Sequence, residues 1–169
     1  MFSLLNRTDH LGLFSNIVFF ALLAFISNVI TFALNWNSNS NTELQPVWAP
    51  PGWAIGGVWL VLLAALGAAR WFTVMQEKNV REKKIRVSGS SWVTGLAVFC
   101  CLYPFWTLAF DSRVMGLIGN GLTLLLAGWV TVKVSQVSGW ATVIVVVLVT
   151  WVIFATLLLI RLVQLNGWN

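Results

Sequence analysis

The chain has 169 residues, of which 59% are hydrophobic and only 9% are charged. Its mean hydropathy of +0.85 and net charge of +5 are those of a strongly hydrophobic, basic protein. This composition excludes an ordinary water-soluble enzyme or binding domain and predicts an integral membrane protein.

Five apolar stretches follow one another along the chain. Each is long enough to cross a hydrocarbon core of about 30 Å as a helix that rises about 1.5 Å per residue, which satisfies its backbone groups without water. Alternating polarity of the barrel type is absent. The predicted fold class is therefore an all-α integral membrane protein, a bundle of five transmembrane helices in a single domain over residues 1–169. The predicted spans are residues 11–34, 53–74, 92–110, 114–132 and 140–165.

The first stretch, residues 11–34, is longer than the apolar core of a signal peptide, so we expect it to remain as the first helix. A polar loop follows it and ends in PVWAPPGW, residues 46–53. Pro51 suits a first helical turn and Pro50 holds the preceding residue extended, so this segment is stiff. It is predicted to act as a lid that holds Trp48 over the helix ends. An interfacial turn anchored by tryptophans is the alternative.

Cationic residues gather on one side of the predicted topology. The net charge of +5 comes largely from residues 76–86, between the second and third spans. Because cationic loops tend to remain cytoplasmic, the N-terminus and this loop are predicted to be cytoplasmic. The loop is expected to serve topology and attraction to lipid headgroups, and no nucleic-acid partner is expected. Arg70, near the end of the second span, is expected to snorkel to the interface.

The spans lack the side chains that several function classes need. The five acidic residues lie in loops or at span ends, and the only histidine, His10, precedes the first helix. An ion-coupled pump or channel is therefore disfavoured. Metal ligation, a protein ligand to haem iron, a hydrolytic triad and a phosphate loop are disfavoured as well. Cys100 and Cys101 are predicted to be buried, inert thiols.

The chain has 11 tryptophans, more than interfacial anchoring requires. Helical periodicity groups Trp59 with Leu63 on the second span and gives the third and fifth spans one aromatic-bearing face each. These two faces consist of Phe99, Tyr103, Trp106 and Phe110, and of Trp140, Trp151, Ala155 and Leu162. If the faces converge, they line a site for a large, planar, apolar ligand. The alternative is that the rings only pack helix against helix.

Two segments resemble the signatures of a known family. Residues 44–69, LQPVWAPPGWAIGGVWLVLLAALGAA, are similar to the first signature of the translocator protein family, also called the tryptophan-rich sensory protein or peripheral benzodiazepine receptor family. Residues 150–166, TWVIFATLLLIRLVQLN, resemble its second signature, with Trp151, Ala155 and Asn166 at family positions. The number of spans and the tryptophan content agree, so the resemblance covers nearly the whole chain.

The resemblance implies a five-helix bundle, often dimeric, with a pocket under the first loop that binds porphyrins and, in animal members, sterols and synthetic aromatic ligands. Phe99 and Tyr103 stand where the family commonly has Gln and Asn, so stacking is expected to dominate over polar recognition. Pro104 is expected to kink the third helix. The predicted ligand-binding residues are Trp48, Pro50, Pro51, Trp53, Trp59, Leu63, Phe99, Tyr103, Trp106, Trp151 and Ala155.

Three functional hypotheses follow. The first is binding of a tetrapyrrole, protoporphyrin or haem, for transport, sensing or disposal, with no required cofactor. The second is a light- and oxygen-dependent breakdown of bound porphyrin, for which Trp59 and Trp151 are the candidate oxidisable rings. The third is a regulatory or scaffold protein that acts through residues 76–86, and sterol transport is the weaker variant of transport. Besides the ligand, the expected partner is the lipid bilayer, and a homodimer is left open.

Overall fold

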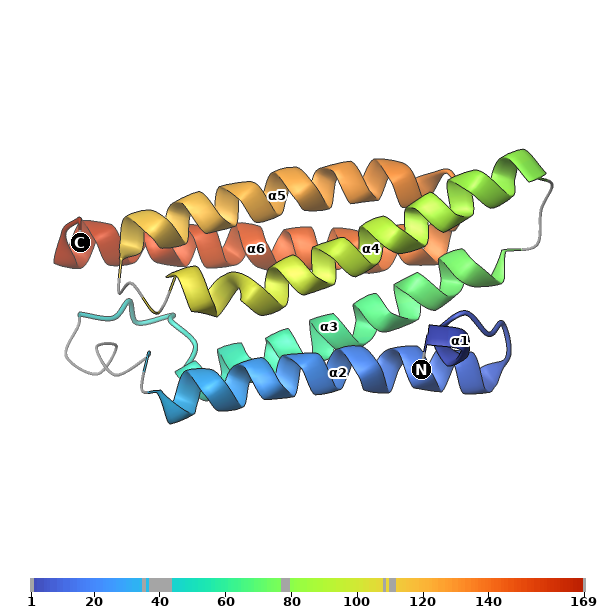
Figure 1. Ribbon diagram of the computed structural model, residues 1–169. Helices are drawn as coiled ribbons and strands as arrows, with labels where there is room; N and C mark the ends of the chain where they lie inside the picture. The colour runs from blue at the N-terminus through green and yellow to red at the C-terminus, as the bar shows by residue number, and fades with distance from the viewer. Residues whose placement is uncertain are drawn as a thin grey trace.

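The computed structural model of the protein describes residues 2–34, 36, 44–76, 80–107, 109 and 112–168. These residues form six helices and no strand (Figure 1). The helices are α1 (Phe2–Leu5), α2 (His10–Ala33), α3 (Gly52–Met75), α4 (Val80–Thr107), α5 (Arg113–Ser135) and α6 (Gly139–Asn166). All five helices after α1 contain a stretch long and apolar enough to cross a membrane, which confirms the predicted five-helix bundle.

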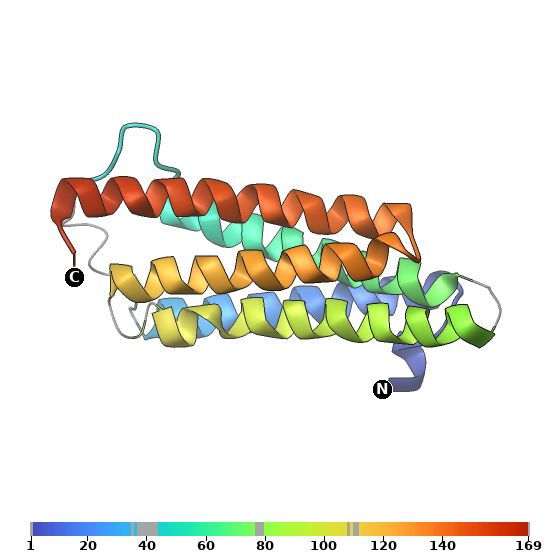
Figure 2. The same ribbon diagram turned by 90° about the horizontal axis from the view of Figure 1, so that it is seen from above.

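The long helices lie side by side, and each runs antiparallel to the next along the chain (Figures 1 and 2). Helix α3 contacts α2, α4 and α6, while α5 packs against α4 and α6. Helix α3 therefore packs against three of the other four long helices. Its Leu63 and Leu66 are buried together with Phe20 of α2, Leu96 of α4 and Leu148 of α6.

Helix α4 departs from the predicted boundaries of the third span. It begins at Val80, well before the predicted start at residue 92, and ends at Thr107. The apolar part of this helix covers Val87–Phe105. Much of the basic segment 76–86 is thus helix rather than loop. Lys, Arg and Glu are good helix formers, so the helix can continue beyond the apolar stretch.

Helix ends use short polar side chains or glycine. Ser112 and Ser138 accept hydrogen bonds from the first turns of α5 and α6, which satisfies backbone N–H groups that have no helical partner. Helix α6 ends at Asn166, and the capping residue Gly167 has a φ of 88°, in the left-handed region that a side chain would disfavour. The Gly167 carbonyl accepts a hydrogen bond from Arg113 Nη1 at 2.9 Å. This contact joins the start of α5 to the end of α6.

The Arg70 side chain, expected to snorkel, donates hydrogen bonds to several other parts of the protein. Its Nη1 donates to the Leu5 carbonyl at 2.6 Å and to Asn16 Oδ1 at 2.8 Å. Its Nη2 donates to Asn6 Oδ1 at 2.9 Å, and its Nε donates to Thr94 Oγ1 at 3.1 Å. The guanidinium therefore ties α3 to the N-terminal segment, to α2 and to α4.

Cationic residues lie toward both ends of the bundle. The end that holds the N-terminus carries Arg7, Arg70 and Lys133, whereas Arg113 and Arg161 lie toward the end that holds the C-terminus (Figure 1). Lys133 Nζ lies 4.5 Å from the centre of the Trp129 ring on α5. This cation–π contact suits a membrane interface. The assignment of this end to the cytoplasm stays a prediction.

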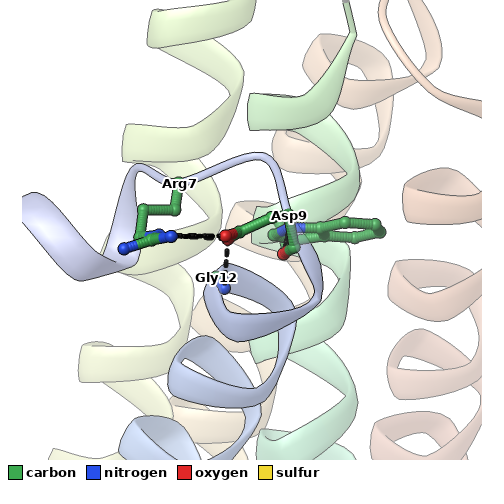
Figure 3. A network of polar contacts seen from close by, with 4 residues as sticks. Arg7, Asp9 and Gly12 are labelled. Carbon is green, nitrogen blue, oxygen red and sulfur yellow. Dashed lines mark hydrogen bonds and ion pairs between the residues drawn. The ribbon is translucent and has the colours of Figure 1, made fainter.

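The start of α2 is fixed by one carboxylate. The Asp9 side chain accepts a hydrogen bond from the Gly12 N–H at 3.0 Å and pairs with the Arg7 guanidinium (Figure 3). The hydrogen bonds from Arg7 and then from Gly12 hold the pKa of Asp9 below its ordinary value. Because the folded state favours the ionised carboxylate, this contribution is complete above the ordinary pKa of aspartate and is lost as the pH falls through the lowered one.

We therefore expect the protection of the Gly12 amide against hydrogen exchange to fall on acidification through the lowered pKa of Asp9. Asparagine is also a good N-cap but does not ionise, so Asp9→Asn should keep a protection that is flat over the same pH range. Protection factors from mass spectrometry or NMR in micelles measure both. An equal decline in the two proteins would show that Asp9 is not the titrating cap.

Helices α2 and α3 approach each other closely at Gly67. A Cβ atom added there would lie 2.5 Å from the Asn16 carbonyl oxygen and 2.8 Å from its carbon. Since both are backbone atoms, the contact cannot relax by a change of rotamer. Small residues at such crossings allow the close packing that drives helix association in lipid.

Gly67→Ala is expected to lower the free energy of unfolding by about 1–3 kcal/mol, the usual range for overpacking. The matched control is Gly57→Ala on the same helix, where an added Cβ meets nothing within 4 Å. The control should be neutral or slightly stabilising, because alanine favours helix over glycine by roughly 1 kcal/mol. Unfolding in micelles measures both variants, and equal stability would contradict the close approach.

Candidate ligand-binding site

A cavity of about 40 Å³ lies between α2, α3 and α4. That volume holds a water molecule or two and is far below the roughly 300–1,000 Å³ of sites for drug-sized ligands. The residues that line it are Ala24, Ser27 and Asn28 of α2, Trp59 and Leu63 of α3, and Cys100, Cys101, Tyr103 and Pro104 of α4. Rings and thiols thus form one wall, and α2 forms the other.

Tyr103 is the side chain that links this cavity to α5. Its ring stacks on Trp59 with centroids 6.4 Å apart and an interplanar angle of 27°. Its hydroxyl lies 2.9 Å from Asn120 Oδ1 and 3.2 Å from the Gly116 carbonyl oxygen. A Cβ added at Gly119 would lie 2.7 Å from the Tyr103 ring, so the ring rests directly on the α5 backbone. The phenol is therefore held at both its face and its tip.

The polar groups on the α2 side of the cavity are used in contacts between helices. Ser27 Oγ donates to the Cys101 carbonyl at 2.9 Å. This carbonyl is next to that of Cys100, which receives no helical hydrogen bond because Pro104 has no N–H. Asn28 Nδ2 donates to the Gly56 carbonyl at 3.1 Å. Recognition in this cavity therefore rests on rings and shape more than on polar side chains.

A second group of rings lies on α6, beneath the segment that leads into α3. The centroids of Trp48 and Phe154 are 5.8 Å apart, and those of Trp151 and Phe154 are 5.3 Å apart. Figure 2 shows the segment before α3 arching over the C-terminal part of α6. The Leu44 N–H donates to Asn166 Oδ1 at 2.9 Å, and Asn166 Nδ2 donates to the Leu44 carbonyl at 3.0 Å. One amide side chain thus fastens this segment to α6.

Comparison with known proteins identifies the family of the chain. The family model described as the TspO/MBR family matches residues 16–165 of the chain, which include most of α2, all of α3 to α5 and nearly all of α6. The chain belongs to the TspO/MBR family. The resemblance drawn from the two tryptophan-rich signatures is thereby confirmed. A search of curated proteins found no match to the sequence.

In this TspO/MBR protein the residues predicted to bind ligand lie in several places. Trp59, Leu63 and Tyr103 line the cavity, and Trp48 and Trp151 belong to the ring cluster on α6. Trp53 is 76% exposed at the start of α3. Pro50, Pro51, Phe99 and Ala155 are not among the described lining residues. The side chain of Trp106 and all of Phe110 lie outside the described residues.

The sequence analysis missed the part that α2 takes in the cavity wall. A signal was present, since the polar residues Asn16, Ser27 and Thr31 recur at helical spacing with Phe20 and Ala24 in this span. All of these are buried. Polar residues within a membrane span face the bundle interior rather than lipid, so this pattern identifies the inward face of α2.

The indole N–H of Trp151 is in an unusual environment. Its Nε1 is buried and has no hydrogen-bond partner among the described residues. A buried N–H without a partner costs roughly 1–3 kcal/mol. Trp151 also lies beside the ring of Phe154, which contacts Trp48 of the overlying segment. A hydrogen-bond acceptor brought in under that segment would relieve this cost.

Asn166→Ala is expected to release the segment that contains Leu44 and Trp48. Each lost hydrogen bond contributes about 0.5–1.5 kcal/mol, so exchange of the Leu44 amide should accelerate roughly ten-fold. Gln164→Ala is the control, because Gln164 lies at the same end of α6 but accepts only an exposed hydrogen bond from Arg161 among those observed. Hydrogen exchange followed by mass spectrometry makes the comparison. Unchanged exchange at Leu44 would show that the amide does not fasten the segment.

Proposed function

We propose that this membrane protein binds a flat, apolar small molecule beside Trp59, and that the ligand is a tetrapyrrole such as protoporphyrin or haem. Transport, sensing or disposal of that ligand is the proposed role. The observation that carries the proposal is the ring stack at the cavity, where Trp59 already holds the aromatic ring of Tyr103 nearly parallel to its own. A surface that stacks one flat ring suits another flat ring.

The other rings support a ligand larger than a single aromatic ring. Trp151 and Phe154 of α6, with Trp48 of the segment before α3, form a second group of rings, and the buried Nε1 of Trp151 is a donor without a partner among the described residues. Tetrapyrroles combine a wide apolar face with hydrogen-bond acceptors at their edge. We therefore assign the ring face of the ligand to Trp59 and its acceptor edge to Trp151.

Binding on this scale requires the site to open. The cavity of about 40 Å³ cannot hold a macrocycle, so protein groups must move aside. Two groups are placed to do so. One is the Tyr103 ring, and the other is the segment that Asn166 fastens to α6. We propose that the described conformation is the closed state of the site.

Protoporphyrin titrated in the dark into the purified protein in nanodiscs, with absorption and tryptophan quenching as readouts, tests this function. Trp59→Phe should weaken binding several-fold, because a well-placed aromatic pair contributes about 0.5–1.5 kcal/mol beyond the area it buries. Trp140→Phe is the control, since Trp140 begins α6 and is 70% exposed. Absence of saturable binding by the parent, or equal weakening by both variants, would overturn the proposal.

A further inference from the structure

The geometry points to Tyr103 as a plug that closes the ligand site, and to Asn120 of α5 as the residue that latches it. This inference rests on the proposed function for the identity of the ligand, but not for the mechanics of the plug. The ring of Tyr103 takes the place against Trp59 that a flat ligand needs. The cavity is small because this side chain, together with its neighbours, fills it.

The latch is a buried polar contact across two helices. Asn120 is 4% exposed and faces the Tyr103 hydroxyl at 2.9 Å, and the Gly116 carbonyl oxygen lies 3.2 Å from the same hydroxyl. The hydroxyl of tyrosine has one hydrogen to donate, and these two acceptors share it. The hydroxyl thus meets α5 at the tip of the ring, while the ring face meets Trp59 and the ring edge rests on Gly119.

The latch also predicts what a ligand must offer to displace the plug. When the Tyr103 hydroxyl leaves, the amide of Asn120 stays buried and lacks a partner, which is costly away from water. A ligand with a hydrogen-bonding group at its edge removes that cost, whereas a plain hydrocarbon does not. The site should therefore favour flat rings with polar edge groups over flat hydrocarbons of the same size.

The reactivity of the two cysteines can measure opening of the plug in the absence of ligand. Cys100 and Cys101 are the only cysteines of the chain, and both line the cavity. Their labelling by N-ethylmaleimide, followed by mass spectrometry, measures how often the cavity opens. Tyr103→Phe keeps the ring and removes the latch, so labelling should accelerate roughly two- to ten-fold, as expected for one lost hydrogen bond. Asn120→Leu removes the latch from the other side and should act in the same direction.

Thr131→Val is the matched control, because it removes a hydroxyl that bonds the Ala127 carbonyl within α5 itself. Its labelling should equal that of the parent. If Tyr103→Phe and Asn120→Leu also label like the parent, Tyr103 is a fixed wall and the inference is wrong. The two latch variants approach the same contact from different helices, so a folding defect in one does not decide the result.

Protoporphyrin binding to the same proteins separates the plug from the proposed function. The plug predicts tighter binding by Tyr103→Phe, by about the factor seen in labelling, whereas weaker binding would make Tyr103 a ligand contact and overturn the inference. Faster labelling with no porphyrin binding by any protein would keep the plug and reject the tetrapyrrole. Porphyrin binding by the parent with unchanged labelling would keep the function and reject the plug.

Discussion

Hydrogen-bonding groups inside a bilayer must find partners within the protein, and this constraint organises the bundle. Arg70 binds three neighbouring segments, Ser27 and Asn28 of α2 reach carbonyls on α4 and α3, and Asn166 holds the segment before α3. Each polar side chain thus fixes the position of one helix or loop against another. Because the polar groups are occupied in this way, the cavity is left with rings, thiols and aliphatic carbons as its free surface.

The fold was predictable because it depends on properties that each segment carries by itself. Length and hydropathy identify a membrane span without knowledge of its neighbours, and the tryptophan-rich signatures identified the family. Boundaries were less predictable. Helix α4 continues into a charged segment, since helix propensity does not end where the apolar stretch ends.

The site was only partly predictable, because periodicity gives the face of a helix but not what meets that face. It grouped Trp59 with Leu63 and placed Tyr103 on an aromatic face, and these three do line the cavity. It could not show that Trp151 would meet Phe154, which in turn meets Trp48, nor that α2 would supply the opposite wall. The hydrogen bonds of Arg70 were hidden for the same reason, since their acceptors lie on three other segments.

A closed site of this kind has consequences for selectivity. If Tyr103 must leave Trp59 before a ligand stacks there, the observed affinity equals the intrinsic affinity reduced by the fraction of open protein. A molecule no larger than the phenol gains about as much stacking free energy with Trp59 as Tyr103 loses. Its binding is therefore weak. A wide ring system gains contacts that Tyr103 never made, with Trp59 and with further apolar surface exposed as the site opens. The same tyrosine that makes the cavity too small for a macrocycle would then favour large aromatic ligands over small ones.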